Sequence, residues 1–268
     1  PVDVTASDWD CTLEPAGPPA GPREPTVRLG LRLVKGLSLA GARRLVQARR
    51  ELSWVSLADL MERARLDRGD LKALAGADAL ANLAGNRRRA VWSVSGLMAV
   101  GRQRERPGQG ALVLPPPQGR DCTPLLAPPG EGAEIAADYA SLGLTLRRHP
   151  VALLRGRLSA HRLLSAREVA EIPEGARIAT AGLVINRQRP AAANNVTFVT
   201  IEDETGCVNL VVWKRVAERQ RAALLGARLL GVYGEVQRES GVTHLIAERL
   251  ADYSSLLGGL VTVSRDFH

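Results

Sequence analysis

The residues best suited to bind a ligand surround a glycine turn near residue 36. Lys35 precedes Gly36, Ser38 follows it, and Arg43 and Arg44 come within the next two turns of a predicted helix. Free N–H groups at a helix start favour an anion, and a glycine lets a phosphate approach the backbone. The spacing therefore predicts a helix-hairpin-helix that grips a DNA backbone without reading bases; an ordinary hairpin with solvated arginines is the alternative. The candidate residues here are Lys35, Gly36, Leu37, Ser38, Gly41, Arg43 and Arg44.

A second basic run, Asn86-Arg-Arg-Arg, stands at the start of another predicted helix. Arginines in the first turn are repelled by the positive end of the helix macrodipole, and a bound phosphate would offset this repulsion. Solvation of the arginines would offset the repulsion as well and is the commoner outcome. We include Arg87 and Arg88 among the candidate DNA-binding residues.

Aromatic and basic residues gather again in the last third of the chain. Phe198 lies in a predicted strand, and Trp213 ends another and is followed by Lys214 and Arg215. Exposed aromatic rings stack on the bases of single strands, and neighbouring cations bind the phosphates. The alternative is that both rings pack in the core, which we favour for Phe198 because it shares strand parity with Val196. The candidate residues for DNA or a partner protein are Arg187, Arg189, Phe198, Trp213, Lys214, Arg215 and Arg238.

Catalytic and metal-binding patterns are not apparent. The acidic cluster Glu202–Glu204 precedes Thr205-Gly206 between two predicted strands, so we expect a β-turn rather than a metal site. The sequence has no glycine-rich phosphate loop and no nucleophile motif. We expect no catalytic residue, no metal and no cofactor in this chain.

Composition limits the classes of protein that the chain can belong to. It has 268 residues, 45% of them hydrophobic, which is enough for two modest domains. No apolar run is long enough to span a membrane, and three scattered cysteines predict a reducing cytoplasm. The net charge is +8, and residues 26–106 hold 17 basic and seven acidic residues. That concentration favours a polyanionic partner for this region.

The first part of the chain has a helical pattern. Residues 1–25 are rich in proline and predict an extended tail or linker. Residues 26–106 show three- and four-residue apolar spacing, with a serine cap at Ser56, a break near Gly76 and a helix after Asn86, which predicts an all-α helix-hairpin-helix domain. Residues 107–175 predict a proline-rich linker followed by helices.

The pattern changes to strands after Gly175. Three predicted strands, a basic helix and two more strands fill residues 176–256, and residues 257–268 predict a C-terminal tail. Five strands with a helix between the third and fourth are typical of the OB-fold β-barrel. An antiparallel sandwich is the alternative.

Several of these stretches resemble a known family. "VRLGLRLVKGLSLAGARRLVQAR", "SLADLMERARL" and "NRRRAVW" resemble the end of the fingers region of bacterial C-family DNA polymerases, which include the polymerase III alpha subunit. "GLVINRQRPAAANNVTFVTIEDETGCVNLVVW" and the final "SRDFH" are similar to its error-prone, damage-inducible branch, the ImuC type. The resemblance spans nearly the whole chain.

The resemblance implies a C-terminal fragment that binds DNA and partners in an error-prone polymerase of translesion synthesis. The family's catalytic carboxylates and Mg ions belong to a palm domain that this chain lacks, so the fragment alone should not synthesise DNA. The implied partners are DNA, an inactive Y-family-like accessory protein (ImuB type) and, through it, the sliding clamp; "QGALVL" from Gln109 is a poor match to a clamp-binding peptide. Two alternatives remain: an OB-fold interaction module with little DNA binding, and the anticodon domain of a tRNA synthetase.

Overall fold

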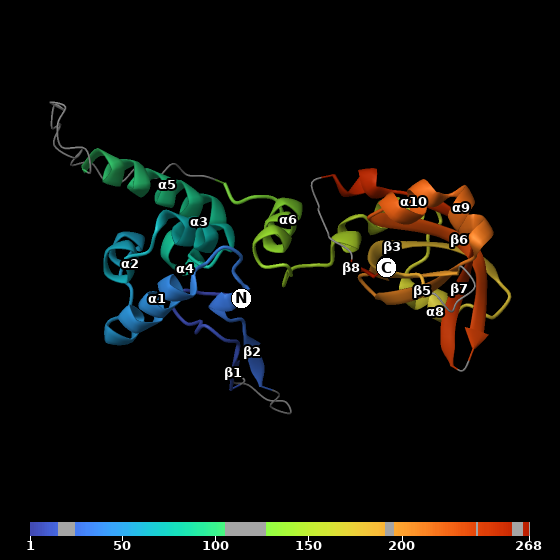
Figure 1. Cartoon of the computed structure of the whole chain (residues 1–268), viewed down its shortest axis with the longest axis horizontal. Helices are drawn as coiled ribbons and strands as arrows, with labels where there is room; N and C mark the ends of the chain where they lie inside the picture. The colour runs from blue at the N-terminus through green and yellow to red at the C-terminus, as the bar shows by residue number, and fades with distance from the viewer. Residues whose placement is uncertain (16–24, 105–126, 191–195, 240, 259–264, 268) are drawn as a thin grey trace. The chain divides into compact units, whose positions relative to one another are not determined.

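The computed structural model describes residues 1–15, 25–104, 127–190, 196–239, 241–258 and 265–267. These residues belong to two compact units (Figure 1). The first comprises residues 1–130 and 137–146, and the second comprises residues 131–136 and 147–268. Among the helices described here, none is long and apolar enough to cross a membrane.

The first unit is mainly helical. A short 3-10 helix, η1, precedes the glycine turn at Gly36, and the longer helix α1 follows it. A two-stranded ribbon, β1 paired antiparallel with β2, lies at the N-terminal end. The elements are β1 (Thr12–Glu14), β2 (Thr26–Arg28), η1 (Leu31–Leu33), α1 (Leu39–Glu51), α2 (Leu57–Ala64), α3 (Arg68–Gly76), α4 (Ala81–Ala84) and α5 (Arg87–Arg104).

Polar side chains fix where these helices begin. The side-chain oxygens of Ser38, Ser56, Asp67 and Asn86 each accept a hydrogen bond from the backbone N–H three residues later. Such caps satisfy one of the orphan N–H groups of the first turn and contribute about 1 kcal/mol each. The expected cap at Ser56, the break near Gly76 and the helix after Asn86 are confirmed.

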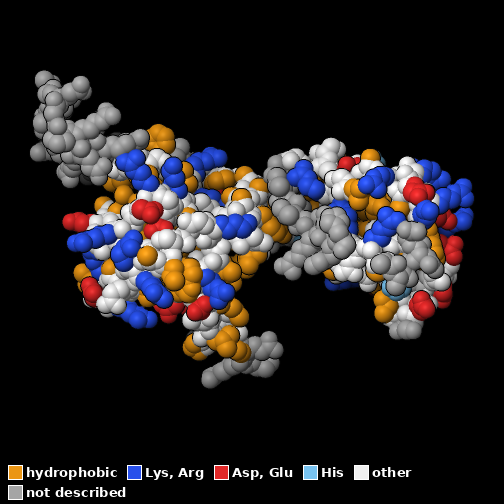
Figure 2. Space-filling view, viewed as in Figure 1, with side chains coloured by type: hydrophobic (Ala, Val, Ile, Leu, Met, Phe, Trp, Pro, Cys, Tyr) orange, Lys and Arg blue, Asp and Glu red, His pale blue; other side chains and the backbone are white. Residues whose placement is uncertain are grey.

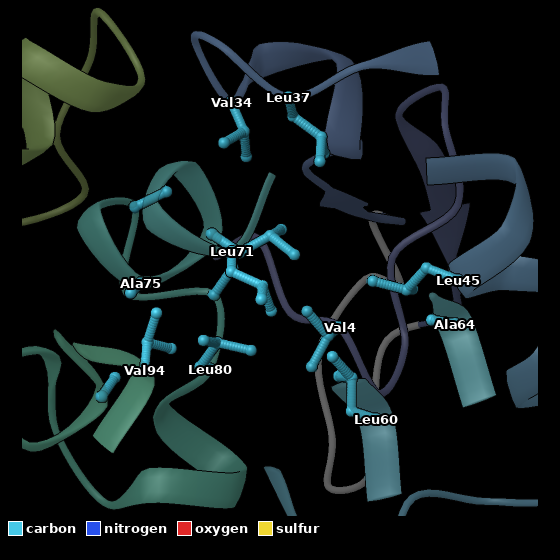
Figure 3. Close-up of a cluster of buried hydrophobic side chains, with 14 of the residues drawn as sticks. Val4, Val34, Leu37, Leu45, Leu60, Ala64, Leu71, Ala75, Leu80 and Val94 are labelled. Carbon is cyan, nitrogen blue, oxygen red and sulfur yellow. The ribbon is translucent and has the colours of Figure 1, made fainter. Parts of the chain in front are cut away.

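Leucine and alanine fill the core of the first unit. Leu45 of α1, Leu60 of α2, Leu71 of α3 and Val94 of α5 converge in one buried cluster (Figure 3). Because the chain has few large aromatic residues, this core depends on the interlocking of medium-sized side chains. The apolar spacing that predicted the helices is also the spacing that lines this core.

The N-terminal residues differ from the expected extended tail. Val2 and Val4 are buried in the same cluster, and the N–H of Val4 donates to the carbonyl of Ala79 at 3.0 Å. The buried Ser7 hydroxyl donates to the carbonyl of Leu29. Residues 1–15 are therefore a packed part of the helical unit, and the proline content that suggested a tail lies mainly beyond them.

The second unit is a closed five-stranded barrel. The strands are β3 (Arg177–Gln188), β4 (Thr197–Asp203), β5 (Gly206–Val212), β6 (Leu229–Glu239) and β7 (Val242–Asp252), with α9 (Lys214–Arg219) and α10 (Arg221–Gly226) between β5 and β6. Their order is β4-β5-β7-β6-β3, and β3 pairs back onto β4. The helical segment between the third and fourth barrel strands and the parallel β5–β7 pair give the OB-fold plan. The OB-fold prediction is confirmed and the sandwich alternative is wrong.

The long strand β3 closes the barrel because it pairs with two neighbours in succession. Its first half, Arg177–Leu183, pairs with β6, and its second half, Leu183–Gln188, pairs with β4. A register shift after Val184 bends the strand between the two pairings. Beyond the barrel, β8 (Arg265–Phe267) pairs parallel with the end of β3, within the segment expected to be a tail.

Short helices precede the barrel, and the acidic turn anchors the last two of them, α7 and α8. They are α6 (Glu131–Ser141), η2 (Pro150–Leu153), α7 (Arg155–Ala160) and α8 (Ala166–Glu171). Arg155 forms ion pairs with Asp203 at 2.9 Å and Glu204 at 2.5 Å, and the hydrogen bond that Arg155 donates to Glu204 raises the pKa of Arg155. Asp203 also accepts the N–H groups of Ala166 and Thr205. The Glu202–Glu204 cluster is therefore a structural turn, as expected.

Candidate nucleic-acid interface

The glycine turn has the geometry of a helical hairpin. Gly36 has φ of +86°, a conformation that favours glycine, and Ser38 caps α1 by accepting the N–H of Gly41 at 2.9 Å. Lys35 at the turn is exposed, and its Nζ donates to the carbonyl of Tyr139 at 2.9 Å. Gly36 as the turn and Ser38 as the cap are confirmed.

A carboxylate from α3 already occupies part of this helix start. The Asp70 side chain is 1% exposed and accepts the N–H of Ser38 at 2.7 Å and the Ser38 hydroxyl at 3.0 Å. A Cβ on Gly41 would lie 2.7 Å from Asp70 Cγ and 2.9 Å from Ser38 Oγ. Asp70 thus supplies internally the anion that we expected from a phosphate. Leu39 and Ala40 are exposed residues, and their first-turn amides have no intrahelical acceptor.

The arginines of α1 divide into those that bond to other parts of the unit and those that do not. Arg44 donates to the carbonyls of Ala64 and Arg65 at the end of α2, both at 3.1 Å. Arg49 binds the N-terminal segment through the carbonyls of Val4 and Ser7 and an ion pair with Asp8 at 2.9 Å; burial lowers its pKa, against the effect of Asp8. Arg43 and Arg50 are exposed and form no hydrogen bond or ion pair with the described residues.

Arg63 of α2 contacts the end of α1, just as Arg44 of α1 contacts the end of α2. Its Nη2 donates to the carbonyls of Ala48 and Leu52 at the end of α1, at 2.5 and 2.6 Å, and its guanidinium lies 4.6 Å from the ring centroid of Trp54. Each helix of the α1–α2 pair therefore caps the C-terminus of the other. Between them lies a shallow hollow of about 370 Å³ lined by Arg43, Arg44, Gln47, Ala48, Glu51 and Arg63.

The arginines that open α5 also have different environments. Arg87 is 6% exposed and forms an ion pair with Asp138. Arg88 is exposed, and its Nη1 donates to the carbonyl of Ala127 at 3.1 Å. A phosphate cannot reach the buried Arg87 without displacing Asp138, so Arg88 is the accessible member of this pair.

Exposed aromatic rings lie on the outer face of the barrel. Phe198 of β4 is 38% exposed and Trp213, just after β5, is 53% exposed. Phe198 pairs across the sheet with Val211, so these two side chains lie on one outer surface of β4 and β5. Trp213 follows β5 directly, two residues beyond Val211. The core position expected for Phe198 is wrong because Thr197, Val199 and Ile201 point inward instead.

The next row of the same face is polar. Thr200 pairs with Asn209, and the Thr200 hydroxyl donates to the Asn209 amide oxygen at 3.2 Å. Neither residue was among the candidates from the sequence. The β4 and β5 parity that exposes Phe198 also places them outward, so correct strand bounds would have identified them.

The basic candidates around the barrel are not equivalent. Arg187 is 7% exposed and donates to the carbonyls of Leu224 and Ala227 at the end of α10, whereas the exposed Arg238 donates to those of Ala170 and Ile172 at the end of α8. The other candidates, Arg189, Lys214 and Arg215, are also exposed, and Lys214 Nζ lies 3.8 Å from Glu218 Oε1. The loop residues Asn194 and Asn195, like Gln109, lie outside the described residues.

Both units carry abundant basic side chains on the visible face (Figure 2). Within the part of the chain that the structure describes, no group of three or more His, Cys, Asp or Glu residues is placed to hold a metal ion. The arrangement offers exposed cations, helix-start amides and aromatic faces. These are the groups that bind phosphates and unpaired bases.

Comparison with known proteins agrees with this chemistry. The helix-hairpin-helix motif family matches residues 1–90, and the OB-fold nucleic acid binding domain family matches residues 178–252. Error-prone DNA polymerases from Azoarcus sp. and Methylococcus capsulatus are 51% and 48% identical over the whole chain. The chain spans 24% and 26% of those relatives, respectively. A solved asparaginyl-tRNA synthetase from Pyrococcus horikoshii covers 38% of this chain and 24% of its own, with 27% identity and a TM-score of 0.30, too low to bear on function.

Proposed function

We propose that this chain, homologous over its whole length to a segment of the error-prone DNA polymerases, is the DNA-handling part of such an enzyme. The whole protein would act in translesion synthesis and damage-induced mutagenesis in the bacterial cytoplasm. The match to about a quarter of each relative and the two family matches support this proposal. We assign no catalytic residue to the chain, and the polymerase's Mg ions would be bound by its palm.

The OB-fold barrel would hold single-stranded DNA on the outer face of β4 and β5. The observation that carries this proposal is the exposure of Phe198 on this face and of Trp213 just after β5, beside the exposed Lys214 and Arg215. Each ring can stack on a base and contribute about 1–3 kcal/mol. The cations beside Trp213 would bind the phosphates of the same strand.

The helical unit would hold the backbone of duplex DNA. Its contact residues would be the amides of Leu39 and Ala40 with Lys35, Arg43 and Arg88, all of which are exposed. Gly36, Leu37, Ser38 and Gly41 shape the turn. Arg44 and Arg87 would support the fold instead, because their guanidinium groups are bound to α2 and to Asp138.

A protein partner is the second candidate for the barrel. Phe198 and Val211 are neighbouring apolar side chains on this face and the exposed Trp213 follows β5, and exposed apolar and aromatic side chains are also a common feature of protein interfaces. The proposed partner is the inactive Y-family-like accessory protein, which would connect the polymerase to the sliding clamp. In this case DNA binding by the barrel would be weak.

Binding titrations with the double variant Phe198→Ala/Trp213→Ala distinguish the two. We expect binding of a 20-nucleotide single strand to weaken by about 30-fold or more, since two rings at about 1–3 kcal/mol each are lost, and little change for a 20-base-pair duplex, because stacking requires unpaired bases. Val242→Ala is the matched control, since Val242 is 45% exposed on the same barrel. Unchanged single-strand affinity, together with loss of accessory-protein capture, would favour the interaction module.

A further inference from the structure

Helix α5 has a core face and an unusual outer face. Ala90, Val94 and Met98 are buried in the core of the first unit. On the other side Trp92 is 55% exposed and Val91 is 46% exposed. Exposing a tryptophan forgoes the burial of a large apolar surface, so a Trp in this position is more informative than an exposed Val.

Two arginines lie one helical turn before Trp92. Arg88 and Arg89 precede it by four and three residues, which places all three on neighbouring parts of the helix surface. Neither arginine forms an ion pair with the described residues. Arg88 donates to the carbonyl of Ala127, and the Nη1 of Arg89 lies 3.1 Å from where a Cβ on Gly85 would be. Because neither neighbour carries a charge, the positive charge of both arginines remains uncompensated.

Glycine follows Trp92 by one turn. A helical side chain at position 96 would lean back toward Trp92, and Gly96 leaves that space open: among the described residues, no atom beyond its chain neighbours and its own helix backbone lies within 4 Å of its Cβ position. Glycine inside a helix costs about 1 kcal/mol relative to alanine, and no close packing at Gly96 compensates for it. The cation–π contacts among the described residues involve Trp54 and Tyr233, so they leave the Trp92 ring uncovered.

We propose that Trp92, flanked by Arg88 and Arg89, is a stacking platform for an unpaired stretch of DNA. The proposal rests on the proposed DNA-handling function and adds a single-strand site to the helical unit. The indole would stack on one base and the arginines would bind the phosphates beside it. The uncompensated arginines favour a polyanion over an apolar protein surface, and a stacking ring requires a base that is not already paired and stacked.

The test uses the full chain and a fluorescein-labelled 20-nucleotide single strand. Because the barrel also binds single strands in our proposal, Trp92→Ala is made both in the native chain and in the Phe198→Ala/Trp213→Ala background. In that background we expect Trp92→Ala to weaken binding about 5- to 100-fold. Trp92→Phe should retain most of the affinity. Val91→Ala, a matched exposed residue of the same helix, should change it less than about twofold.

An abasic strand of the same length shows whether stacking is the cause. It keeps the phosphates and removes the bases, so Trp92→Ala should have no effect on its binding. Equal affinities of the background and its Trp92→Ala variant for the normal strand would overturn the platform, and so would an equal loss for the abasic strand. Failure of the native chain to bind any DNA would instead overturn the proposed function, and this proposal with it.

Discussion

Replacing Gly41 with alanine tests whether Asp70 occupies the start of α1. A Cβ at position 41 would lie 2.7 Å from Asp70 Cγ and closer still to Oδ2. Asp70 cannot move aside freely, because it is buried and bonded to the N–H and hydroxyl of Ser38. Gly41→Ala should therefore break those two bonds, although alanine is otherwise the better helix former.

The expected loss of folding free energy follows from the hydrogen bonds that are broken. Two hydrogen bonds to a carboxylate, with the donor Ser38 exposed to water, contribute about 2–3 kcal/mol together. Asp70→Ala should cost that amount, and Gly41→Ala should cost about 1–2 kcal/mol after the helix-propensity gain of about 1 kcal/mol. In the Asp70→Ala background the clash with the carboxylate is gone and the remaining close atom is the rotatable Ser38 hydroxyl oxygen at 2.9 Å, so Gly41→Ala should be about neutral. The expected coupling is about 1–2 kcal/mol.

Urea unfolding of the full chain measures this coupling. Trp9, Trp54 and Trp92 lie in the first unit and Trp213 in the second, so carrying Trp213→Phe in every chain makes tryptophan fluorescence report on the first unit alone. The four chains of the double-mutant cycle are compared at the same pH and salt. If the costs of Gly41→Ala and Asp70→Ala simply add, the carboxylate does not hold the helix start and our account of the turn is wrong.

The other predictions concern charge and pH. The double variant Arg43→Ala/Arg50→Ala should weaken duplex binding and lower the slope of log binding constant against log salt concentration by about two, because each exposed arginine contacts about one phosphate. Arg44→Ala is the control. It should lower the stability of the first unit by about 1–2 kcal/mol and change the slope less. Mobility-shift titrations at several salt concentrations measure the slopes, and equal slopes for the native chain and the double variant would contradict the assignment. Burial lowers the pKa of His149 below its ordinary value of 6.5 and outweighs the nearby carboxylates, which raise it. The folded state therefore binds a proton less readily than the unfolded chain. The second unit should lose stability as pH falls from about 7.5 through 6.5. His149→Asn, whose side-chain oxygen can still accept the Val151 N–H, should flatten this slope in urea unfolding between pH 5.5 and 7.5, and an unchanged slope would assign it to other groups.

Local patterns were enough to predict both folds. Strand alternation, the helical segment after Trp213 and the turn at Thr205-Gly206 predicted the OB-fold order because each is a property of neighbouring residues. The helix starts at Ser38 and Ser56 were predictable for the same reason. The core position predicted for Phe198 from strand parity was wrong because the reference residue, Val196, lies before β4 and not in it.

The environments of the candidate side chains were less predictable. Asp70 meets Ser38 across 32 residues of sequence, and no local pattern contains that contact. Arg87 and Arg187 look like solvated charges in the sequence, yet one meets Asp138 and the other meets the end of α10. A guanidinium is suited to such places because its planar fork can satisfy several acceptors at once.

These structural arginines also change the meaning of the positive charge of residues 26–106. Arg44 donates to backbone carbonyls, which carry no net charge, so this binding leaves its positive charge uncancelled. Such residues still contribute to the field that attracts a polyanion over distances near the Debye length of about 8–10 Å. The residues that contact DNA phosphates directly would be Arg43, Arg50 and Arg88. The basic composition is therefore a guide to how fast DNA is attracted, whereas stacking residues such as Trp92, Phe198 and Trp213 would determine which strand is retained.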